Sequence, residues 1–248
     1  MNDRDSICID AGVDPLLTEL REPIDLLHAD RDHPARHRLH SFIRADFQGA
    51  HGARVDHFYP SLLGFSSRQG LRAVIGFRGG CTDGRHQPLF AEQYLDAPAE
   101  DLVRARTGLG VARHALVEVG NLALDEPGHA RWVIAASTAY LAAAGYRWVL
   151  FTATRPLANA FLRLGLRPVA LAPADPARLP DGGASWGRYY EHGPVVYAGD
   201  ILAGARKLQA AVRMGRPQLQ ALLRASVLLG AEWDDECAGV TPAGALAP

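Results

Sequence analysis

The pattern of apolar positions is clearest in the middle of the chain, where a strand signature, a helix signature and a second strand signature follow one another. The run VEVGNLAL (117–124) is largely apolar, as in a buried strand. The apolar stretch 132–151 begins rich in alanine, breaks at Gly145 and continues into the aromatic, β-branched run WVLFTAT (148–154). Its length would suffice to span a bilayer, but the break and the change of residue type favour a buried helix followed by a buried strand. Two parallel strands joined in this way leave a crevice at their carboxyl ends, where open α/β sheets bind ligands.

The segments before this unit predict a helix, a meander of strands and a second helix. An apolar stripe at helical spacing, with a proline in its first turn, runs from about 33 to 49. Runs bounded by turn residues predict strands at 54–59, 71–78 and 88–95. A helix is expected at 98–107, where a proline precedes several charged residues.

After the second buried strand, a helix opens on a polar cap, and the pattern then becomes irregular. The run at 172–185 is rich in proline, alanine and glycine and predicts a surface loop. Short strands are expected at 188–191 and 194–200. From 200 to 230 the apolar spacing is helical, and Pro217 divides it into two helices.

Composition and charge narrow the class of protein. At 248 residues and 48% apolar content, the chain can bury a sizeable core as one large domain or one domain with an appendage. A net charge of −1 and a single lysine, Lys207, argue against a nucleic-acid partner, which needs a basic face. Cys8, Cys81 and Cys237 form no CxxC pair and the histidines are scattered, so we expect no disulfide framework and no metal site. The amino terminus has no secretory pattern, and a cytoplasmic protein is expected.

The helix after the second buried strand carries a characteristic order of residue types: Asn159, Ala160, Phe161, Gly165 and Leu166. In this order it resembles the corresponding helix of GCN5-related acyltransferases. Five separated segments also resemble the thermostable hemolysin family: HFYPSLLGF (57–65), VIGFRGG (74–80), LFAEQYLDAPAE (89–100), VEVGNLAL (117–124) and SWGRYYEHGPVVYAGDI (185–201). The resemblance covers about residues 36–203.

The resemblance implies an α/β fold with a mixed central sheet of the acyl-CoA N-acyltransferase type and a C-terminal helical extension. The sheet order looks like that of acyl-homoserine-lactone synthases. Patterning and composition, together with the resemblance, divide the chain into four parts: a lead-in at 1–31, an acyltransferase-like domain at 32–203, a helical extension at 204–236 and a disordered tail at 237–248.

Glu118 lies between two valines of the first buried strand, where an ionised side chain must be paired or face a polar cleft. Burial would raise its pKa, which suits a general base that takes a proton from an amine. A bulge at Gly120, as in many acyltransferases of this fold, would bring Glu118 and Asn121 to one face. The alternative is a structural ion pair with Arg113 or another arginine.

Glu92 is the second candidate base. In a strand at 88–95, Glu92 would share one face with Phe90 and Tyr94, and Tyr94 could act as the acid. The alternative is a solvated carboxylate on an edge strand. A tyrosine is expected to protonate the departing thiolate in either case.

The turn DEPGHA (125–130) matches the superfamily's pyrophosphate loop in part. Gly128 and Ala130 are retained, but Asp125 stands where the superfamily usually has arginine or glutamine. Backbone N–H groups at the helix start could hold a phosphate, and Arg131 would add positive charge. Asp125 either caps the helix or repels a pyrophosphate. Repulsion would favour the phosphopantetheine arm of an acyl carrier protein, with its single phosphodiester, over coenzyme A.

Further donor-binding positions are expected on both strands and the following helix: Ala123, Leu124, Thr154, Arg155 and Asn159. The backbone N–H groups near Ala123 and Leu124 would polarise the thioester carbonyl. Aromatic residues could wall a tunnel for the acyl chain or simply pack in the core: Phe58, Phe65, Phe90, Trp186, Tyr189 and Tyr190.

The sequence, with the resemblance, therefore predicts transfer of a fatty acyl group from a thioester of coenzyme A or an acyl carrier protein to the amine of a small molecule. Two other functions stay open. One is a membrane-active cytolytic protein, as the family name says. The other is a ligand-binding domain without catalysis. No transmembrane segment is expected.

Overall fold

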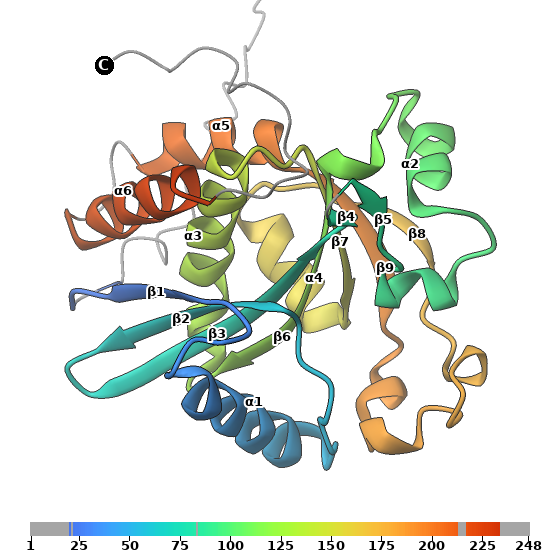
Figure 1. The fold of residues 1–248 in the computed structure, drawn as a ribbon, viewed down its shortest axis with the longest axis horizontal. Coiled ribbons are helices and arrows are strands. Elements are labelled where there is room, and N and C mark those ends of the chain that lie inside the picture. Colours follow the sequence, from blue (N-terminus) through green and yellow to red (C-terminus); the bar gives the residue numbers. More distant parts are fainter. Residues whose placement is uncertain (1–19, 21, 83, 213–216, 234–248) are drawn as a thin grey trace, which may run out of the picture.

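The structure is a computed structural model, and it describes residues 20, 22–82, 84–212 and 217–233. Its centre is a sheet in the order β1-β2-β3-β6-β7-β9-β8 (Figure 1). The strands are β1 (Asp25–Ala29), β2 (Ser61–Ser67), β3 (Gly70–Gly79), β6 (Leu116–Leu124), β7 (Trp148–Ala153), β8 (Val169–Pro173) and β9 (Val195–Asp200). β6 and β7 pair in parallel, and every other neighbouring pair of this sheet is antiparallel. A small ribbon, β4 (Cys81–Thr82) with β5 (Arg85–His86), stands beside it.

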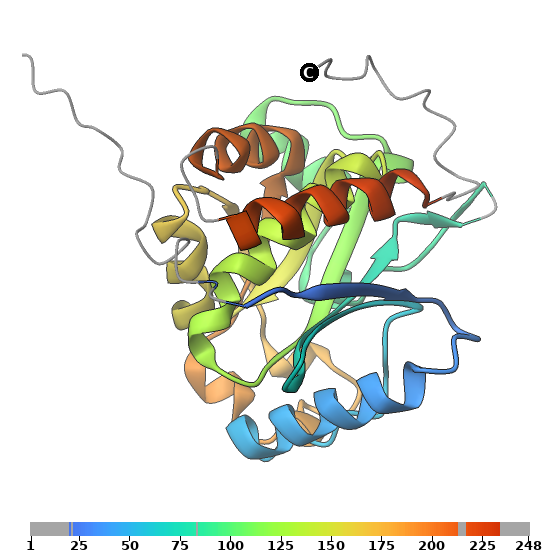
Figure 2. The same ribbon diagram turned by 90° about the vertical axis from the view of Figure 1, so that its left-hand side faces the viewer.

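Helices cover both faces of the sheet (Figures 1 and 2). One face packs against α1 (Arg36–His51) and α2 (Ala99–Thr107). The other face packs against α3 (Ala130–Ala143), α4 (Arg155–Arg163), α5 (Ile201–Val212) and α6 (Pro217–Ala231). Short 3-10 helices lie in the connections: η2 (Phe90–Tyr94), η3 (Arg113–Ala115), η4 (Pro127–His129), η5 (Pro176–Arg178), η6 (Ala184–Trp186) and η7 (Tyr189–His192).

The helix α3 is apolar almost all round because it lies between the sheet and a second layer of helices. Leu208 of α5 and Leu219 and Leu222 of α6 are buried in the same core cluster as α3. The helical extension expected at 204–236 therefore packs on the main core as far as the structure describes it. The tail at 237–248 and most of the lead-in lie outside the described residues.

The predicted strand–helix–strand unit is confirmed. The apolar stretch 132–151 divides into α3 and β7, and no helix in the described residues is long and apolar enough to cross a membrane. α1 and α2 form close to their predicted limits, and Pro217 begins α6. The fold is the predicted mixed α/β type.

Three predicted strands are wrong. The segment 54–59 has no strand; the strand begins after Pro60, as β2. The segment 88–95 holds η2, because the carboxylates of Glu92 and Glu118 accept the backbone N–H groups of residues 89–91. The segment 188–191 lies mainly in η7, which ends at Gly193 in the left-handed conformation (φ 54°).

Two strands of the sheet were not expected. β1 lies within the predicted lead-in, so the sheet begins before residue 32. β8 precedes and overlaps the predicted loop and contains a proline and two alanines. Both are edge strands, where short length and proline are tolerated because one side has no strand partner. Neither therefore carries a strong strand signature.

Candidate active site

β6 and β7 part at their carboxyl ends. They pair from Leu116 opposite Trp148 to Val119 opposite Phe151, and no further. On its other side β6 bulges: Gly120 pairs with Gly76 and Ala123 with Val74, so two residues of β6 oppose one of β3. Asn121, in the bulge, has φ 49°, a left-handed conformation that asparagine tolerates better than most residues. The predicted crevice and bulge are both present.

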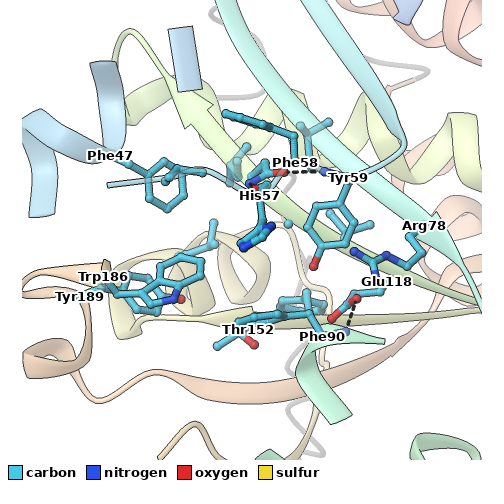
Figure 3. A pocket seen from close by; sticks show the side chains of 18 of the residues that line it. Phe47, His57, Phe58, Tyr59, Arg78, Phe90, Glu118, Thr152, Trp186 and Tyr189 are labelled. Carbon is cyan, nitrogen blue, oxygen red and sulfur yellow. Dashed lines mark hydrogen bonds between the residues drawn. The ribbon is translucent and has the colours of Figure 1, made fainter. Parts of the chain in front are cut away.

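A cavity of about 840 Å³ occupies this opening. Its lining comes from both faces of the sheet, so it passes between the two strands. On the face of α3 and α4 the lining is mainly apolar: Ile134, Leu141, Val149, Leu157, Phe161 and Ile201. On the face of α1 it is mainly aromatic: Phe47, Phe58, Phe90, Tyr94, Trp186, Tyr189 and Tyr190 (Figure 3). Of the aromatic residues expected around a tunnel, Phe65 is instead fully buried in the core.

Glu118 lines this cavity although it is 1% exposed. Its carboxylate accepts the backbone N–H groups of Phe90 (2.8 Å) and Ala91 (2.6 Å). Burial raises the pKa of Glu118, and these N–H groups, the Arg78 guanidinium and the Tyr59 hydroxyl oppose part of the rise. Of the predicted alternative, a pair with Arg113 is wrong, because Arg113 binds Glu92 and Glu100. A different arginine, Arg78, acts on the Glu118 carboxylate.

Tyr59 lies in a slot made by two glycines that face each other across β3 and β6. A Cβ at Gly120 would lie 2.5 Å from Tyr59 Cε2, and one at Gly76 would lie 2.9 Å from Tyr59 Cβ. The Arg78 guanidinium stands 5.0 Å from the centre of the tyrosine ring. The Tyr59 hydroxyl donates to Glu118, and burial, with this carboxylate, raises its pKa well above the ordinary value. Figure 3 shows Tyr59 and Arg78 converging on Glu118.

Asn121 holds the segment that carries Tyr59. Its side-chain oxygen accepts the Tyr59 N–H (3.0 Å), and its amide nitrogen donates to the His57 carbonyl (3.4 Å). One bond at each end of its amide lets Asn121 position Tyr59.

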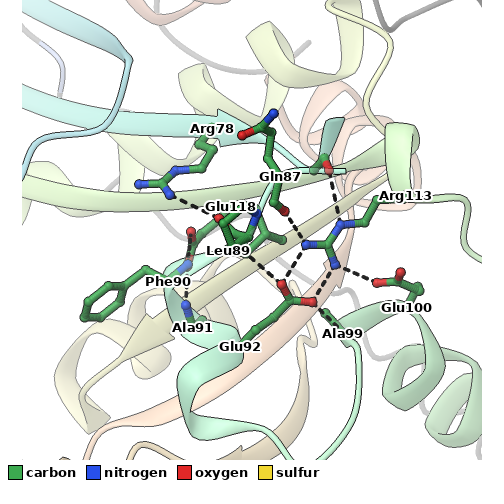
Figure 4. A network of polar contacts seen from close by, with 12 residues as sticks. Arg78, Gln87, Leu89, Phe90, Ala91, Glu92, Ala99, Glu100, Arg113 and Glu118 are labelled. Atoms are coloured by element: carbon green, nitrogen blue, oxygen red, sulfur yellow. Dashed lines mark hydrogen bonds and ion pairs between the residues drawn. The ribbon is translucent and has the colours of Figure 1, made fainter. Parts of the chain in front are cut away.

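Glu92 belongs to a separate ion-pair network (Figure 4). Its carboxylate binds Arg113 through both oxygens, at 2.5 and 2.6 Å, and Arg113 also binds Glu100 at 2.8 Å. Burial acts to raise the pKa of Glu92, but the bonds from Arg113 and from the N–H groups of Ala99 and Leu89 outweigh it and lower the pKa. The predicted solvated edge carboxylate is therefore wrong, and Glu92 is not among the residues that line the cavity.

Tyr94 does line the cavity. Its hydroxyl lies 2.5 Å from the Tyr190 hydroxyl, and burial raises the pKa of Tyr94. The two phenols join η2 to η7 across the aromatic side of the cavity.

The charged side chains of the predicted phosphate loop form ion pairs with one another and with Arg72. Asp125 binds Arg72 at 2.7 Å and His129 Nδ1 at 2.6 Å, and Arg72 also reaches Glu126 at 3.5 Å. The predicted helix cap is wrong, because Asp125 binds these side chains and α3 begins at Ala130 with no side-chain hydrogen bond at its N-cap residue, His129. Arg72 offsets part of the negative charge that would repel a phosphate.

The profile of the thermostable hemolysin family matches residues 29–205. The chain belongs to this family. No curated protein sequence matches it. Among solved structures it is similar to the acyl-homoserine-lactone synthase LasI, with 10% identity and a TM-score of 0.50 over 73% of this chain and 91% of LasI.

Two further solved structures are similar to this thermostable hemolysin family member. FeeM, an N-acyl amino acid synthase from uncultured soil microbes, has 15% identity and a TM-score of 0.49 over 77% of this chain and 99% of its own. BjaI, a CoA-dependent acyl-homoserine-lactone synthase with SAM and isopentyl-CoA, has 14% identity and a TM-score of 0.49 over 83% and 99%. At such identities the LasI likeness shows the fold alone.

The structure brings together four of the predicted site residues around the cavity: Glu118, Tyr94, Asn121 and Thr154. The other predicted donor-binding residues are not in its lining: Ala123, Leu124, Gly128, Ala130, Arg131, Arg155 and Asn159. No cluster of metal-ligating side chains is found among the described residues. Sequence reasoning missed two features. Tyr59 precedes Pro60, which predicts a place at the cleft, but only the glycines of neighbouring strands hinted at its contact with Glu118. Nothing in the sequence distinguished Asp46, the cavity carboxylate of α1, from other helix carboxylates.

Proposed function

We propose that this chain is a GNAT-like acyltransferase that moves a fatty acyl group from a thioester to the amine of a small molecule. The observation that carries the proposal is the parted pair β6 and β7, with a buried carboxylate and a tyrosine hydroxyl beside the opening. A fatty acyl thioester joins two long, narrow chains, the acyl chain and the pantetheine arm, and a slot through a sheet admits such a molecule lengthwise. The apolar side of the cavity suits an acyl chain, and the aromatic side suits the acceptor.

The reaction needs one proton to leave the amine and one to reach the thiolate. We assign the first to Glu118, because burial raises its pKa and so makes its carboxylate a stronger base than an exposed glutamate. Tyr59 donates to Glu118, so it can pass a proton between the acceptor and the carboxylate, and a cavity tyrosine, Tyr59 or Tyr94, protonates the thiolate. The bulged backbone at Asn121 and Leu122 lines the cavity and supplies N–H groups to the thioester oxygen as negative charge develops.

We assign the donor to an acyl carrier protein rather than free coenzyme A. The loop that would meet a diphosphate carries Asp125 and Glu126, and Arg72 is shared between them. A phosphopantetheine arm presents one phosphodiester, so the carrier-bound donor meets less repulsion there.

The family name refers to lysis, and the proposed product offers a route to it. An N-acylated amine is an amphiphile, and amphiphiles insert into membranes. On this reading lysis requires the acyl donor.

The test is product formation by purified protein supplied with acyl carrier protein thioesters, acyl-CoA and a panel of amines, followed by mass spectrometry. Glu118→Gln keeps the size of the side chain and removes its charge, and we expect the rate to fall by roughly two to four orders of magnitude. Glu100→Gln, whose carboxylate lies in the Arg113 network, is the matched control and should keep the rate per folded molecule. Lysis by the Glu118→Gln protein without any donor would refute the acyltransferase assignment.

A further inference from the structure

Asp46 is a cavity carboxylate that the proposed reaction does not use. It lies on α1, half-buried, beside the buried Phe47, and it lines the cavity on its aromatic side. The neighbouring aromatic rings form a continuous group: Phe47 and Trp186 lie 6.1 Å apart, and Trp186 and Tyr189 5.5 Å apart. Such a wall suits the apolar body of an amine or the face of a cation.

The other cavity carboxylates already have partners. Asp56 pairs with Arg54 at 3.1 Å. The Asp181 carboxylate accepts the N–H groups of Gly183 and Ser185. Glu118 accepts two N–H groups, as described above. Asp46 has no ion pair with any described residue.

The arginines near the cavity are engaged elsewhere, and burial lowers the pKa of His51, the cavity histidine of the same helix, which favours its neutral form. Arg44, on the same helix, donates to the Val55 carbonyl and stands 4.8 Å from the centre of the Phe58 ring. Arg54 pairs with Asp56, and Arg72 pairs with Asp125. Burial raises the pKa of Asp46 to about 6, opposed in part by the backbone N–H of Leu124, and no charged side chain contributes to the shift. A half-buried carboxylate without a counter-charge gains most from a cation that enters from outside.

Building on the proposed function, we propose that Asp46 binds a positively charged group of the acceptor other than the nitrogen that is acylated. A nitrogen held as an ammonium by a carboxylate keeps its proton and has no lone pair for attack, so the bound cation and the nucleophile are different groups. The distance between Asp46 and Glu118 also requires two different groups of the acceptor. Asp46 lies beside Leu124, whereas Glu118 lies six residues earlier on β6, roughly 15–20 Å away at about 3.3 Å per residue. The acceptor class is therefore a diamine, or an amine with a second cationic group.

Three probes of equal length separate the possibilities: 1,8-diaminooctane, 8-amino-1-octanol and 1,8-octanediol. In calorimetry at pH 8, the unmodified protein should bind the diamine about 10- to 100-fold more tightly than the diol. Asp46→Asn should remove this difference, and Asp56→Asn, which removes a cavity carboxylate that Arg54 already pairs, should keep it. The preference should also disappear below about pH 5, where Asp46 is protonated and the diamine is still fully charged.

Acylation provides the second arm. With an acyl carrier protein thioester, kcat/KM for the diamine should exceed that for the amino alcohol about ten-fold or more, and Asp46→Asn should make them equal. Equal binding of diamine and diol by the unmodified protein, or a preference that survives Asp46→Asn, would overturn the assignment of Asp46. If no probe is acylated but the Asp46-dependent binding holds, the cation site stands and the acyltransferase proposal fails.

Discussion

The packing of Tyr59 against Gly120 gives the most direct test of how the site is built. In Gly120→Ala the new methyl carbon would lie 2.5 Å from Tyr59 Cε2 and 2.9 Å from the Tyr59 hydroxyl oxygen, both well inside van der Waals contact. The ring cannot retreat easily, because its Cβ already lies against Gly76 and Arg78 covers it. Tyr59 must therefore shift and weaken its bond to Glu118.

Overpacking of this kind costs about 1–3 kcal/mol, which corresponds to a fall in melting temperature of roughly 2–10 °C for a chain of this size. Activity should fall further than stability, since the hydroxyl is displaced from the carboxylate. Calorimetric unfolding and the acyl-transfer rate per folded molecule are the measurements. Gly49→Ala is the control: it lies in the helix α1 with nothing within 4 Å of the new carbon, and it should stabilise slightly.

A double-mutant cycle decides between a local clash and a general weakening of β6. Tyr59→Ala alone opens a cavity, and in that background Gly120→Ala should cost little or nothing, because its partner ring is gone. If Gly120→Ala is as destabilising without the ring as with it, or if it leaves both stability and rate unchanged, the glycine slot does not position Tyr59.

Three further measurements follow from the charged groups. Glu92→Gln should lower the free energy of unfolding by about 3–5 kcal/mol at neutral pH, because Arg113 loses one of its two carboxylate partners. The folded pKa of Glu92 lies below 4.5, so this loss should shrink as the pH falls below that value. A difference in denaturant unfolding that does not change with pH would contradict this account. Asp46→Asn should raise the free energy of unfolding by about 1–3 kcal/mol above pH 6 and leave it unchanged below pH 4. The reason is that the fold favours the neutral form of Asp46, whose pKa is raised from 3.8 to about 6, and asparagine is neutral at every pH. A difference in urea midpoint between the two proteins that does not change with pH would rule this out. Asp125→Arg should tighten coenzyme A in calorimetry by freeing Arg72 for phosphate, and tight binding by the unmodified protein would instead remove the preference for a carrier protein.

The elements that the sequence predicts well are those with a strong apolar period. The unit β6–α3–β7 could be predicted because it is buried on all sides: both of its strands lie between other strands, and its helix is covered by other helices. Burial of this kind requires the long apolar runs that the sequence shows. The segment 88–95 could not, because its backbone donors bind Glu118, which lies far along the chain, and no local pattern reports that contact. The edge strands β1 and β8 were not predicted for a different reason. A strand that pairs on one side only can form with little strand propensity, so its sequence pattern is weak.

The two glutamates chosen as candidate bases show where sequence reasoning reaches its limit. Glu92 and Glu118 both occur among apolar residues, and nothing local distinguishes them. In the folded chain Glu92 binds Arg113 and its pKa is lowered, so it stays ionised and holds no proton near neutral pH. Glu118 has only backbone N–H groups, a tyrosine hydroxyl and a more distant arginine, and burial raises its pKa. A base must both release and accept a proton within the working pH range. Arg113, the arginine named in the alternative interpretation of Glu118, instead binds Glu92, and this leaves Glu118 as the glutamate suited to proton transfer.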